Sequence, residues 1–375
     1  MGSKLQGTLG GSTMKKKKRF KAKYLLFLII PIVLIGVLAG VYFYKLSAKI
    51  KRPDAKKEVK IEKNKDVVLE KDEDDKSYDI ALFGVDARDK SLGKGNRTDV
   101  CMIAHVDGNT NKVNLFSLYR DTYVDIPDHG MDKLTHAYSY NGYELALSTI
   151  NTNFDMDVQK FVTVNFVALE KAINLLGGVT IDVQEDEVKW VNGYVRSLNR
   201  ESGLNQVSYI SGPGKQTLNG SQAVAYCRIR YTSGGDLKRT ERQRTVLNEM
   251  LNKAKSTDVS TLVSIVNEMT DYIYTNLSTT ELLGLAKNVA SYDIEKSEGF
   301  PYHVIAAKDW CAADKSKKLD IVVGTNYLND MITLHKEVLG YKNYEPSSKV
   351  KEIADKIAGY QKPVEDSTTT ETSGN

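Results

Sequence analysis

The chain has 375 residues, of which 41% are hydrophobic, and its formal net charge is +4 at pH 7. This length allows one large domain or two smaller ones with a proper hydrophobic core, and so small a net charge points to no particular partner. The cysteines Cys101, Cys227 and Cys311 are few and odd in number, so they do not indicate a disulfide framework. We expect Cys101 and Cys227 to be buried thiols in strands rather than nucleophiles.

The N-terminal part of the chain predicts a membrane anchor. A basic stretch from Lys15 to Lys23 leads into the run from Tyr24 to Tyr44, which has no charged residue and is long enough to cross a bilayer. A cleaved signal peptide has a shorter apolar run, and the candidate cleavage triplet at 37–39 lies inside this one. We predict a transmembrane helix at 24–44, a cytoplasmic segment at 1–23 and an extracellular remainder, because the denser basic block precedes the run.

The rest of the chain divides into three parts. Residues 45–77 are rich in Lys, Glu and Asp, which predicts a charged extracellular linker. Residues 341–375 read as a largely disordered tail, apart from a weak helix at 349–360. Between them, residues 78–340 form one globular domain.

Alternating or apolar runs within the domain predict strands, and the residues at 107–111 predict a hairpin turn between the second and third of them. The predicted strands lie at 78–84, 99–106, 112–118, 160–165, 178–183 and 302–306. Helical spacing predicts helices at 138–153, 167–176, 221–226, 237–254, 259–272, 279–291 and 326–339. Interleaved strands and helices, with a hairpin near the start, predict a single α/β (or α+β) domain in which helices flank a sheet.

Acidic residues mark the ends of the predicted strands. Asp86 follows the first strand, Asp99 opens the second, and the pair Arg120 and Asp121 ends the third. Neighbouring strands therefore bring these side chains to one edge of the sheet. Two carboxylates with open water positions suit Mg²⁺, or Mn²⁺ in its place, particularly when a substrate phosphate completes the coordination. Taken singly, each residue is as readily a turn former or a surface ion pair.

The stretch from Tyr226 to Arg244 is the densest group of cations in the predicted domain. On a strand, Arg228 and Arg230 would share one face, and Arg239, Arg242 and Gln243 have the spacing of one helix face. The intervening loop is expected to end in a helix N-cap at Asp236. Two such elements can hold a phosphate through guanidinium forks and free backbone N–H groups. A solvated face with salt bridges is the plainer interpretation, but only Asp236 and Glu241 are nearby acids.

These motifs, in this order, resemble the LytR-CpsA-Psr family of membrane-anchored phosphotransferases over roughly 78–340. The matching blocks are GVDARD, NRTDV, SLYRDT, KLTHAYSYNG, NFVALEKAINLLGGVTIDV, GKQTLNGSQAVAYCRIRY and GGDLKRTERQR. One departure is Tyr119, which stands where many members have proline before the Arg-Asp pair. The resemblance implies a mixed sheet flanked by helices and a hydrophobic pocket for a polyprenyl tail. We expect this pocket between the sheet and the helices near 138–150 and 167–176.

The resemblance also implies an activity, partners and roles for residues. Members transfer a glycopolymer from undecaprenyl pyrophosphate to peptidoglycan with Mg²⁺, which makes a lipid-linked glycan and peptidoglycan the expected partners and excludes nucleic acid. By this resemblance, Asp86 and Asp99 match the metal-associated acids. The pyrophosphate-binding set is matched by Arg120, Arg228, Arg230, Arg239 and Gln243. Further residues of the same motifs are assigned to the site without fixed roles: Arg88, Arg97, Asp121, Asp236 and Arg242.

The expected chemistry is attack by a sugar hydroxyl on one phosphorus of the pyrophosphate. Arginines and a metal neutralise the charge that grows on the departing lipid phosphate. Asp121, Asp236 or one metal-associated Asp accepts the hydroxyl proton, and the sequence does not choose between them. The same arginines would also suit two other functions. One is non-enzymatic binding or sensing of a lipid-linked glycan, and the other is hydrolysis of polyprenyl pyrophosphate. The acids favour an enzyme, because carboxylates among the arginines repel a pyrophosphate unless a metal intervenes.

Overall fold

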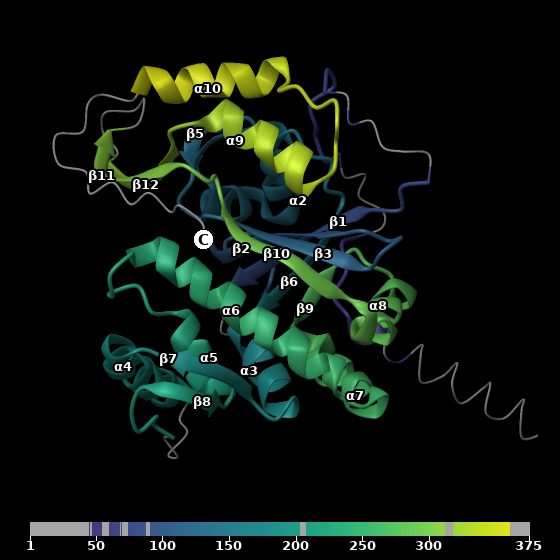
Figure 1. The fold of residues 1–375 in the computed structure, drawn as a ribbon, viewed down its shortest axis with the longest axis vertical. Helices are drawn as coiled ribbons and strands as arrows, with labels where there is room; N and C mark the ends of the chain where they lie inside the picture. The colour runs from purple at the N-terminus through teal and green to yellow at the C-terminus, as the bar shows by residue number, and fades with distance from the viewer. Residues whose placement is uncertain are drawn as a thin grey trace, which may run out of the picture. The chain divides into compact units, whose positions relative to one another are not determined.

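The computed structural model describes residues 45, 47–54, 60–67, 69, 74–87, 91–202, 208–311 and 318–360 (Figure 1). The predicted segments 1–23 and 24–44, residue Arg88 and residues 361–375 lie outside this set. Within it, no helix is both long and apolar enough to cross a membrane. The chain divides into a unit from Met1 to Ser47 and a larger unit from Ala48 to Asn375. The larger unit contains the sheet and the helices around it.

A six-stranded mixed sheet forms the centre of this unit, with the strand order β10-β3-β2-β1-β6-β9. Its strands are β1 (Tyr78–Val85), β2 (Thr98–Val106), β3 (Lys112–Leu118), β6 (Lys160–Asn165), β9 (Ile273–Thr275) and β10 (Asp293–Phe300). The pairs β1–β2, β2–β3 and β6–β9 are antiparallel, whereas β1–β6 and β3–β10 are parallel. The expected mixed sheet flanked by helices is confirmed.

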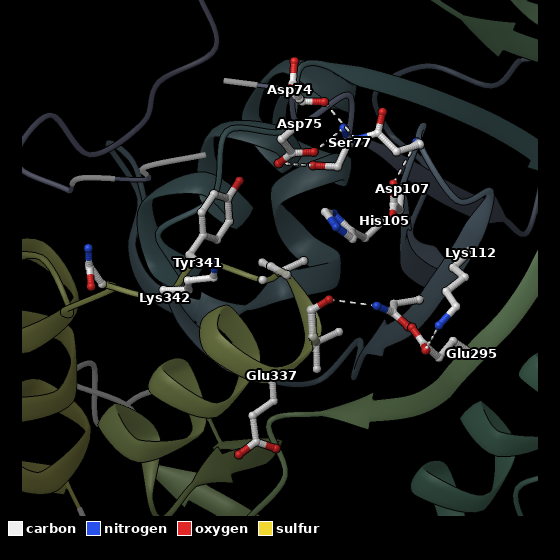
Figure 2. A pocket seen from close by; sticks show the side chains of 16 residues that line it. Asp74, Asp75, Ser77, His105, Asp107, Lys112, Glu295, Glu337, Tyr341 and Lys342 are labelled. Atoms are coloured by element: carbon white, nitrogen blue, oxygen red, sulfur yellow. Dashed lines mark hydrogen bonds and ion pairs between the residues drawn. The ribbon is translucent and has the colours of Figure 1, made fainter. Parts of the chain in front are cut away.

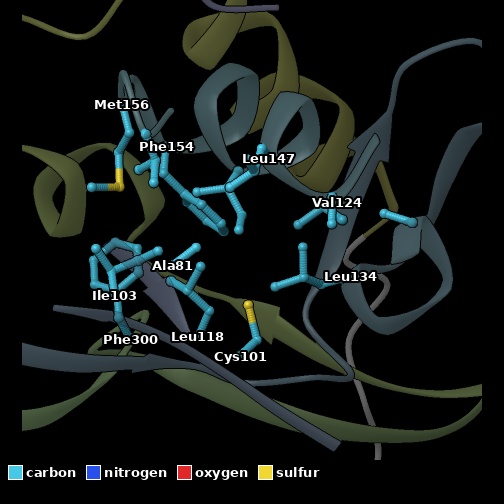
Figure 3. Packing of buried hydrophobic residues seen from close by; sticks show 14 of the residues in the cluster. Ala81, Cys101, Ile103, Leu118, Val124, Leu134, Leu147, Phe154, Met156 and Phe300 are labelled. Atoms are coloured by element: carbon cyan, nitrogen blue, oxygen red, sulfur yellow. The ribbon is translucent and has the colours of Figure 1, made fainter. Parts of the chain in front are cut away.

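One face of the sheet packs against a continuous apolar core (Figure 3). Side chains alternate between the two faces along a strand, and Ala81, Phe83 and Ile103 point into this core. The helices on this side are α2 (Leu134–Phe154), α9 (Tyr327–Thr333) and α10 (Ser348–Tyr360), with the π-helical turn η3 (Leu334–Val338) after α9. The hairpins of β4 (Tyr123–Ile126) with β5 (Gly130–Lys133) and of β11 (Val304–Cys311) with β12 (Lys318–Gly324) complete it.

The opposite face carries the helices that follow β6 in the chain (Figure 1). These are α3 (Phe166–Leu175), α4 (Glu185–Ser202), α5 (Gly220–Cys227), α6 (Gly235–Lys255) and α7 (Val259–Met269). A smaller apolar cluster joins α3, α4, α5 and α6 to the hairpin of β7 (Val179–Val183) and β8 (Gly214–Leu218). Helix α8 (Thr279–Lys287) and the 3₁₀ turns η1 (Thr270–Tyr272) and η2 (Val289–Ser291) connect α7 to β10.

The folded unit extends beyond the predicted limits of 78 and 340. Asn64, in the predicted linker, is buried, and its Nδ2 donates to Asp155 Oδ1 at 2.6 Å and to Thr152 O at 2.8 Å. In the predicted tail, Tyr344 is buried and donates to Asp155 Oδ2 at 2.7 Å. The expected helix at 349–360 corresponds to α10, whose apolar side lies in the core. Asn64 and Tyr344 belong to the domain because they complete a buried hydrogen-bond network around Asp155, and α10 belongs to it because its apolar side packs in the core.

A second part of the predicted linker pairs with the edge of the sheet. Lys51 forms a parallel bridge with Tyr274 of β9, and Thr275 N donates to Lys51 O at 3.1 Å. Arg52 NH2 donates to Thr279 Oγ1 at 2.9 Å, at the start of α8. This stretch of chain therefore covers part of a strand edge that would otherwise present unpaired backbone groups.

Candidate active site

The predicted acidic and basic residues meet at one edge of the sheet. Val85 at the end of β1 pairs with Thr98 at the start of β2, so Asp86 and Asp99 lie on the same edge. Strand β3 runs antiparallel to β2, which brings Arg120, just past its end, to that edge as well. A cavity of about 580 Å³ opens here. It is lined by eight of the predicted site residues: Asp86, Arg97, Asp99, Arg120, Arg228, Arg230, Arg239 and Gln243.

The arginine-bearing segment after α5 is a loop rather than the strand that we expected. Arg228 is the C-cap residue of α5, and Arg230 lies in the irregular turn that follows. Gly234, with φ 82°, is the N-cap of α6, and Asp236 lies in the first turn instead of capping it. Glycine adopts this positive φ without strain, so the chain turns sharply and presents Arg228, Arg230 and Arg239 to the same cavity.

Arg120 is held among carboxylates. One of its terminal nitrogens donates to Asp99 Oδ1, and its Nε donates to Asp121 Oδ1 at 3.4 Å. Lys133 Nζ lies 3.3 Å from the same Asp121 oxygen. Burial acts to lower the pKa of Arg120, but Asp121, Asp99 and Asp236 outweigh it and raise that pKa above its ordinary value. Arg120 is therefore fixed as a cation at the edge of the cavity, and Asp121 lies behind it.

Arg239 and Asp236 form a pair on the first turns of α6. Their side chains approach to 2.7 Å, and that of Arg239 is only 6% exposed. Burial raises the pKa of Asp236 despite the neighbouring Arg239. Among the described residues, neither Arg239 Nε nor Asp236 Oδ2 has a hydrogen-bond partner, although both atoms are buried. A buried donor on a cavity-lining arginine is costly unless a ligand satisfies it.

Aromatic rings support Arg228 and Arg230, two further arginines of the cavity. The Arg228 guanidinium lies 5.5 Å from the ring centre of Phe166 and 5.6 Å from that of Tyr194. Arg230 stacks on Tyr231 at 5.1 Å and donates to its hydroxyl at 2.9 Å. Asp86 is 3.8 Å from Arg228, which is a loose contact. Rings hold these cations through their faces, so N–H groups of Arg228 remain available to an oxyanion.

Arg242 does not line the cavity, although the sequence predicts it among the residues of the site. Its Nε donates to Glu187 Oε1 at 2.7 Å, and both side chains are 2% exposed. Its other nitrogens donate to Ile229 O at 3.2 Å and Thr232 Oγ1 at 2.6 Å. Arg242 thus ties the loop that carries Arg228 and Arg230 to α4. The sequence does not predict this role, because Arg242 and Glu187 lie 55 residues apart in the chain and meet only in the folded domain.

Gln243 and Tyr119 hold the backbone around the site. Gln243 Nε2 lies 3.4 Å from Cys227 O and 3.5 Å from Asp99 O, which joins α6 to the cavity floor. Tyr119 N donates to Phe300 O at 3.3 Å. Proline could not make this bond, because it has no N–H. Tyr119 therefore extends the contact between the end of β3 and β10 by one residue.

Asp86 and Asp99, the two carboxylates that line the cavity, can hold a divalent cation only if substrate oxygens complete its coordination. Among the described residues, no group of three or more His, Cys, Asp or Glu side chains is arranged to hold a metal ion. Asp86 and Asp99 both line the cavity, but each also contacts an arginine. Mg²⁺ commonly binds through one or two carboxylates with phosphate oxygens and waters. The donor set is compatible with that mode and not with an all-protein metal cage.

An apolar cavity of about 240 Å³ adjoins the polar one. The sheet contributes Leu82, Val100, Met102, Val162 and Val164, which point away from the packed face, and helices α3, α6 and α7 contribute Leu169, Val246, Leu247, Met250 and Met269. Phe166, Cys227 and Gln243 line both cavities. We expected an apolar pocket between the sheet and the helices near 138–150 and 167–176. The second helix does line it, whereas the first lies on the packed face.

A third cavity, of about 550 Å³, lies at the opposite ends of the same strands (Figure 2). It gathers acids, but several of them serve the local chain: Asp107 accepts from Asn109 N and Thr110 N, and Asp75 accepts from Ser77 N. Glu295 pairs with Lys112 at 2.5 Å. Of the predicted site residues that the structure describes, none lines this cavity.

Cys101 and Cys227 are the cysteines whose side chains the structure describes. Cys101 lies in β2 and Cys227 ends α5, so the prediction of a strand holds for the first alone. Both are buried free thiols. Burial raises the pKa of Cys101, and it raises the pKa of Cys227 to about 12. Neither thiol is a nucleophile at neutral pH.

The edge of the sheet thus carries an arginine-lined cavity that adjoins an apolar one. Comparisons with known proteins agree with this arrangement. The LytR_cpsA_psr family profile matches residues 37–314, and the chain therefore belongs to the LytR-CpsA-Psr family. The polyisoprenyl-teichoic acid–peptidoglycan teichoic acid transferase TagT of Bacillus subtilis is 30% identical over 286 residues, which cover 74% of this chain and 84% of that protein. The corresponding transferase TagU of Bacillus licheniformis is 31% identical over 271 residues, 71% of this chain and 82% of that one.

Solved structures show the same fold. The crystal structure of Bacillus subtilis TagT superposes with a TM-score of 0.53 at 25% identity and covers 73% of this chain and 96% of that one. A structure of the LytR-CPS2A-psr family protein YwtF (TagT) with bound octaprenyl pyrophosphate lipid has a TM-score of 0.51 at 24% identity, over 73% of this chain and 95% of that one.

Proposed function

We propose that this protein transfers an anionic or capsular glycopolymer from a polyprenyl pyrophosphate carrier to peptidoglycan. The observation that carries the proposal is the junction of two cavities, one lined by five arginines and the other almost wholly apolar. A polyprenyl pyrophosphate has the same two parts, a doubly charged head and a hydrocarbon chain. The teichoic acid transferases among its relatives and the octaprenyl pyrophosphate in a structure of the same fold support this assignment.

The reaction begins with the pyrophosphate in the arginine-lined cavity. A hydroxyl of peptidoglycan attacks the phosphorus that carries the glycan, the bond to the bridging oxygen breaks, and prenyl phosphate leaves. Arg239 is buried, Arg120 is partly buried, and both are fixed by ion pairs, so they stabilise the charge that develops on the departing phosphate at little reorganisation cost. Arg228 and Arg230, held by rings, orient the phosphoryl oxygens. A bound Mg²⁺, held by Asp86 and Asp99, would supply additional charge neutralisation.

The attacking hydroxyl must lose a proton, and the structure offers two carboxylates near the arginines. Asp121 is engaged by Arg120 and Lys133. Asp236 has a free oxygen among the described residues and a raised pKa, and a raised pKa suits a proton acceptor near neutral pH. We therefore favour Asp236 as the base. Neither residue lines the cavity directly, so Arg239 would have to shift for Asp236 to reach the hydroxyl.

We place this activity at the outer face of the membrane, with the helix predicted at 24–44 as the anchor and residues 1–23 in the cytoplasm. Linkage of the carrier lipid to the bilayer requires a transferase that works at the membrane surface. The polymer itself is named only by class, as a teichoic acid or a capsular polysaccharide.

The test uses the full-length protein in detergent with a synthetic glycan linked to polyprenyl pyrophosphate and soluble peptidoglycan oligomers. Mass spectrometry of the products distinguishes the three functions. A phosphodiester between the glycan and peptidoglycan supports the transferase. Glycan phosphate and prenyl phosphate in the absence of acceptor would show a hydrolase. Tight binding without any bond cleavage would show a binding protein.

A further inference from the structure

Phe166 lies where the two cavities meet. It lines the arginine-lined cavity and the apolar cavity alike. The backbone fixes it there, because β6 ends at Asn165 and α3 begins at Phe166, with Asn165 Oδ1 accepting from Ala168 N at 3.0 Å. An N-cap of this kind locks the first turn of a helix. The ring is therefore carried by a rigid element at the junction of the two cavities.

The orientation of Arg228 depends on that ring. Its guanidinium lies 5.5 Å from the ring centre of Phe166 and 5.6 Å from that of Tyr194, and within the described part of the chain its carboxylate contact is Asp86, at 3.8 Å. Arg120 and Arg239, by contrast, are held by close ion pairs with Asp99 and Asp236. Of these three arginines, Arg228 is thus the one whose position rests mainly on aromatic packing. A change in the orientation of the Phe166 ring therefore affects the orientation of Arg228 more than that of Arg120 or Arg239.

The apolar cavity is small for its expected occupant. Its 240 Å³ is below the roughly 300–1,000 Å³ of typical ligand sites. It therefore encloses only the part of a polyprenyl chain nearest the pyrophosphate, and that part necessarily borders Phe166. With the cavity empty, the ring has apolar space to turn into. With the first isoprene units in place, that space is filled.

We propose that Phe166 is a positioning residue that couples filling of the apolar cavity by the first isoprene units to the orientation of Arg228. The inference rests on the proposed function and adds a mechanism for lipid selectivity. The isoprene units pack against Phe166, the ring stays against the guanidinium, and Arg228 is aligned with the phosphoryl oxygens. Binding of a remote part of the substrate then raises the rate of the chemical step rather than affinity alone.

The experiment compares two donors that carry the same glycan pyrophosphate, one with a single isoprene unit and one with three. It measures kcat and KM separately for the full-length wild type and for Phe166→Ala, Phe166→Leu and Phe166→Tyr. For the wild type we expect kcat to be about tenfold higher with three units. For Phe166→Ala and Phe166→Leu, kcat with three units should fall to the one-unit value, while KM still favours the longer chain. Phe166→Tyr keeps the ring and should behave like the wild type.

The possible failures are distinct. If the wild type transfers neither donor nor a full-length polyprenyl donor, the proposed function is wrong, and this inference falls with it. If the wild type transfers both donors with equal kcat, or if Phe166→Ala and Phe166→Leu keep the tenfold difference, Phe166 does not couple the two cavities and the transferase assignment stands. Phe166 is only half-buried, and thermal unfolding of each variant checks that the fold is retained. The leucine variant answers the same question should the alanine variant unfold.

Discussion

The two faces of the central sheet are built from the same strands but differ in how completely they are filled. On one face, Phe83, Phe116 and Phe161 pack with α2 and α10 into a continuous core. On the other, alternate residues of β1, β2 and β6 face a cavity that α3, α6 and α7 do not close. The filled face supplies stability, and the hollow face supplies room for a ligand. The charged edge joins the two, because the strands end there.

The largest effects on transfer should come from Asp86 and Asp99, which lie at the charged edge of the sheet and belong to neither face. Asp86→Ala or Asp99→Ala removes a carboxylate from the cavity and opens no core, so transfer should fall by orders of magnitude while the melting temperature changes little. Chelation by EDTA should have the same effect on the wild type. Full activity in EDTA, or in either variant, would rule out a metal on these residues.

Arginine-to-lysine changes test whether the edge needs geometry as well as charge. Arg120→Lys or Arg228→Lys keeps the charge and loses the planar fork, so we expect kcat to fall by about 10²–10³ with a smaller change in lipid affinity. Arg196→Lys is the matched control, because Arg196 is an exposed residue of α4 that contacts Tyr209 and does not line the cavity. Equal, mild effects at all three positions would mean that the arginines form only a solvated basic surface.

A pair of leucines compares the two faces directly. Leu147 on α2 is fully buried in the packed core, whereas Leu247 on α6 is partly exposed and lines the cavity. Leu147→Ala should lower the free energy of unfolding by about 2–5 kcal/mol, and Leu247→Ala by much less, because its surroundings are already hollow. Urea denaturation measures both. Equal losses would show that the hollow face is packed in solution.

The smallest effect concerns pH. Because burial raises the pKa of Asp236 above its ordinary 3.8, the folded state binds this proton more tightly than the unfolded state. The wild type should therefore lose stability as pH rises through the window between 3.8 and the raised value. Asp236→Asn removes that loss, so its melting temperature should exceed that of the wild type at pH 7. Below pH 3.8 the two melting temperatures should be alike. Transfer should fall in this variant. Parallel melting curves for the two proteins at every pH would contradict the raised pKa.

The sequence predicts the charged edge well and the support around it poorly. Asp86, Asp99 and Arg120 follow or open strands with clear apolar runs, so their meeting at one edge follows from topology. The rings that hold Arg228 and Arg230, and the buried pair of Arg242 with Glu187, depend on α4 and the loop after α5. Helix α4 has only a narrow apolar stripe within a polar sequence, and β10 is an edge strand with few apolar residues. Elements such as α4 and β10 form because they pack against the rest of the domain, and the local sequence alone does not indicate that packing.

The most direct test of this account is to identify the lipid that the full-length protein retains through purification in detergent. Mass spectrometry of an organic extract should find a polyprenyl phosphate or pyrophosphate in the wild type. It should find far less in Leu247→Trp, which fills the apolar cavity while leaving the arginines in place. Recovery of the same polyprenyl lipid from both proteins, or of no prenyl lipid from the wild type, would contradict the claim that the hollow face of the sheet holds the carrier.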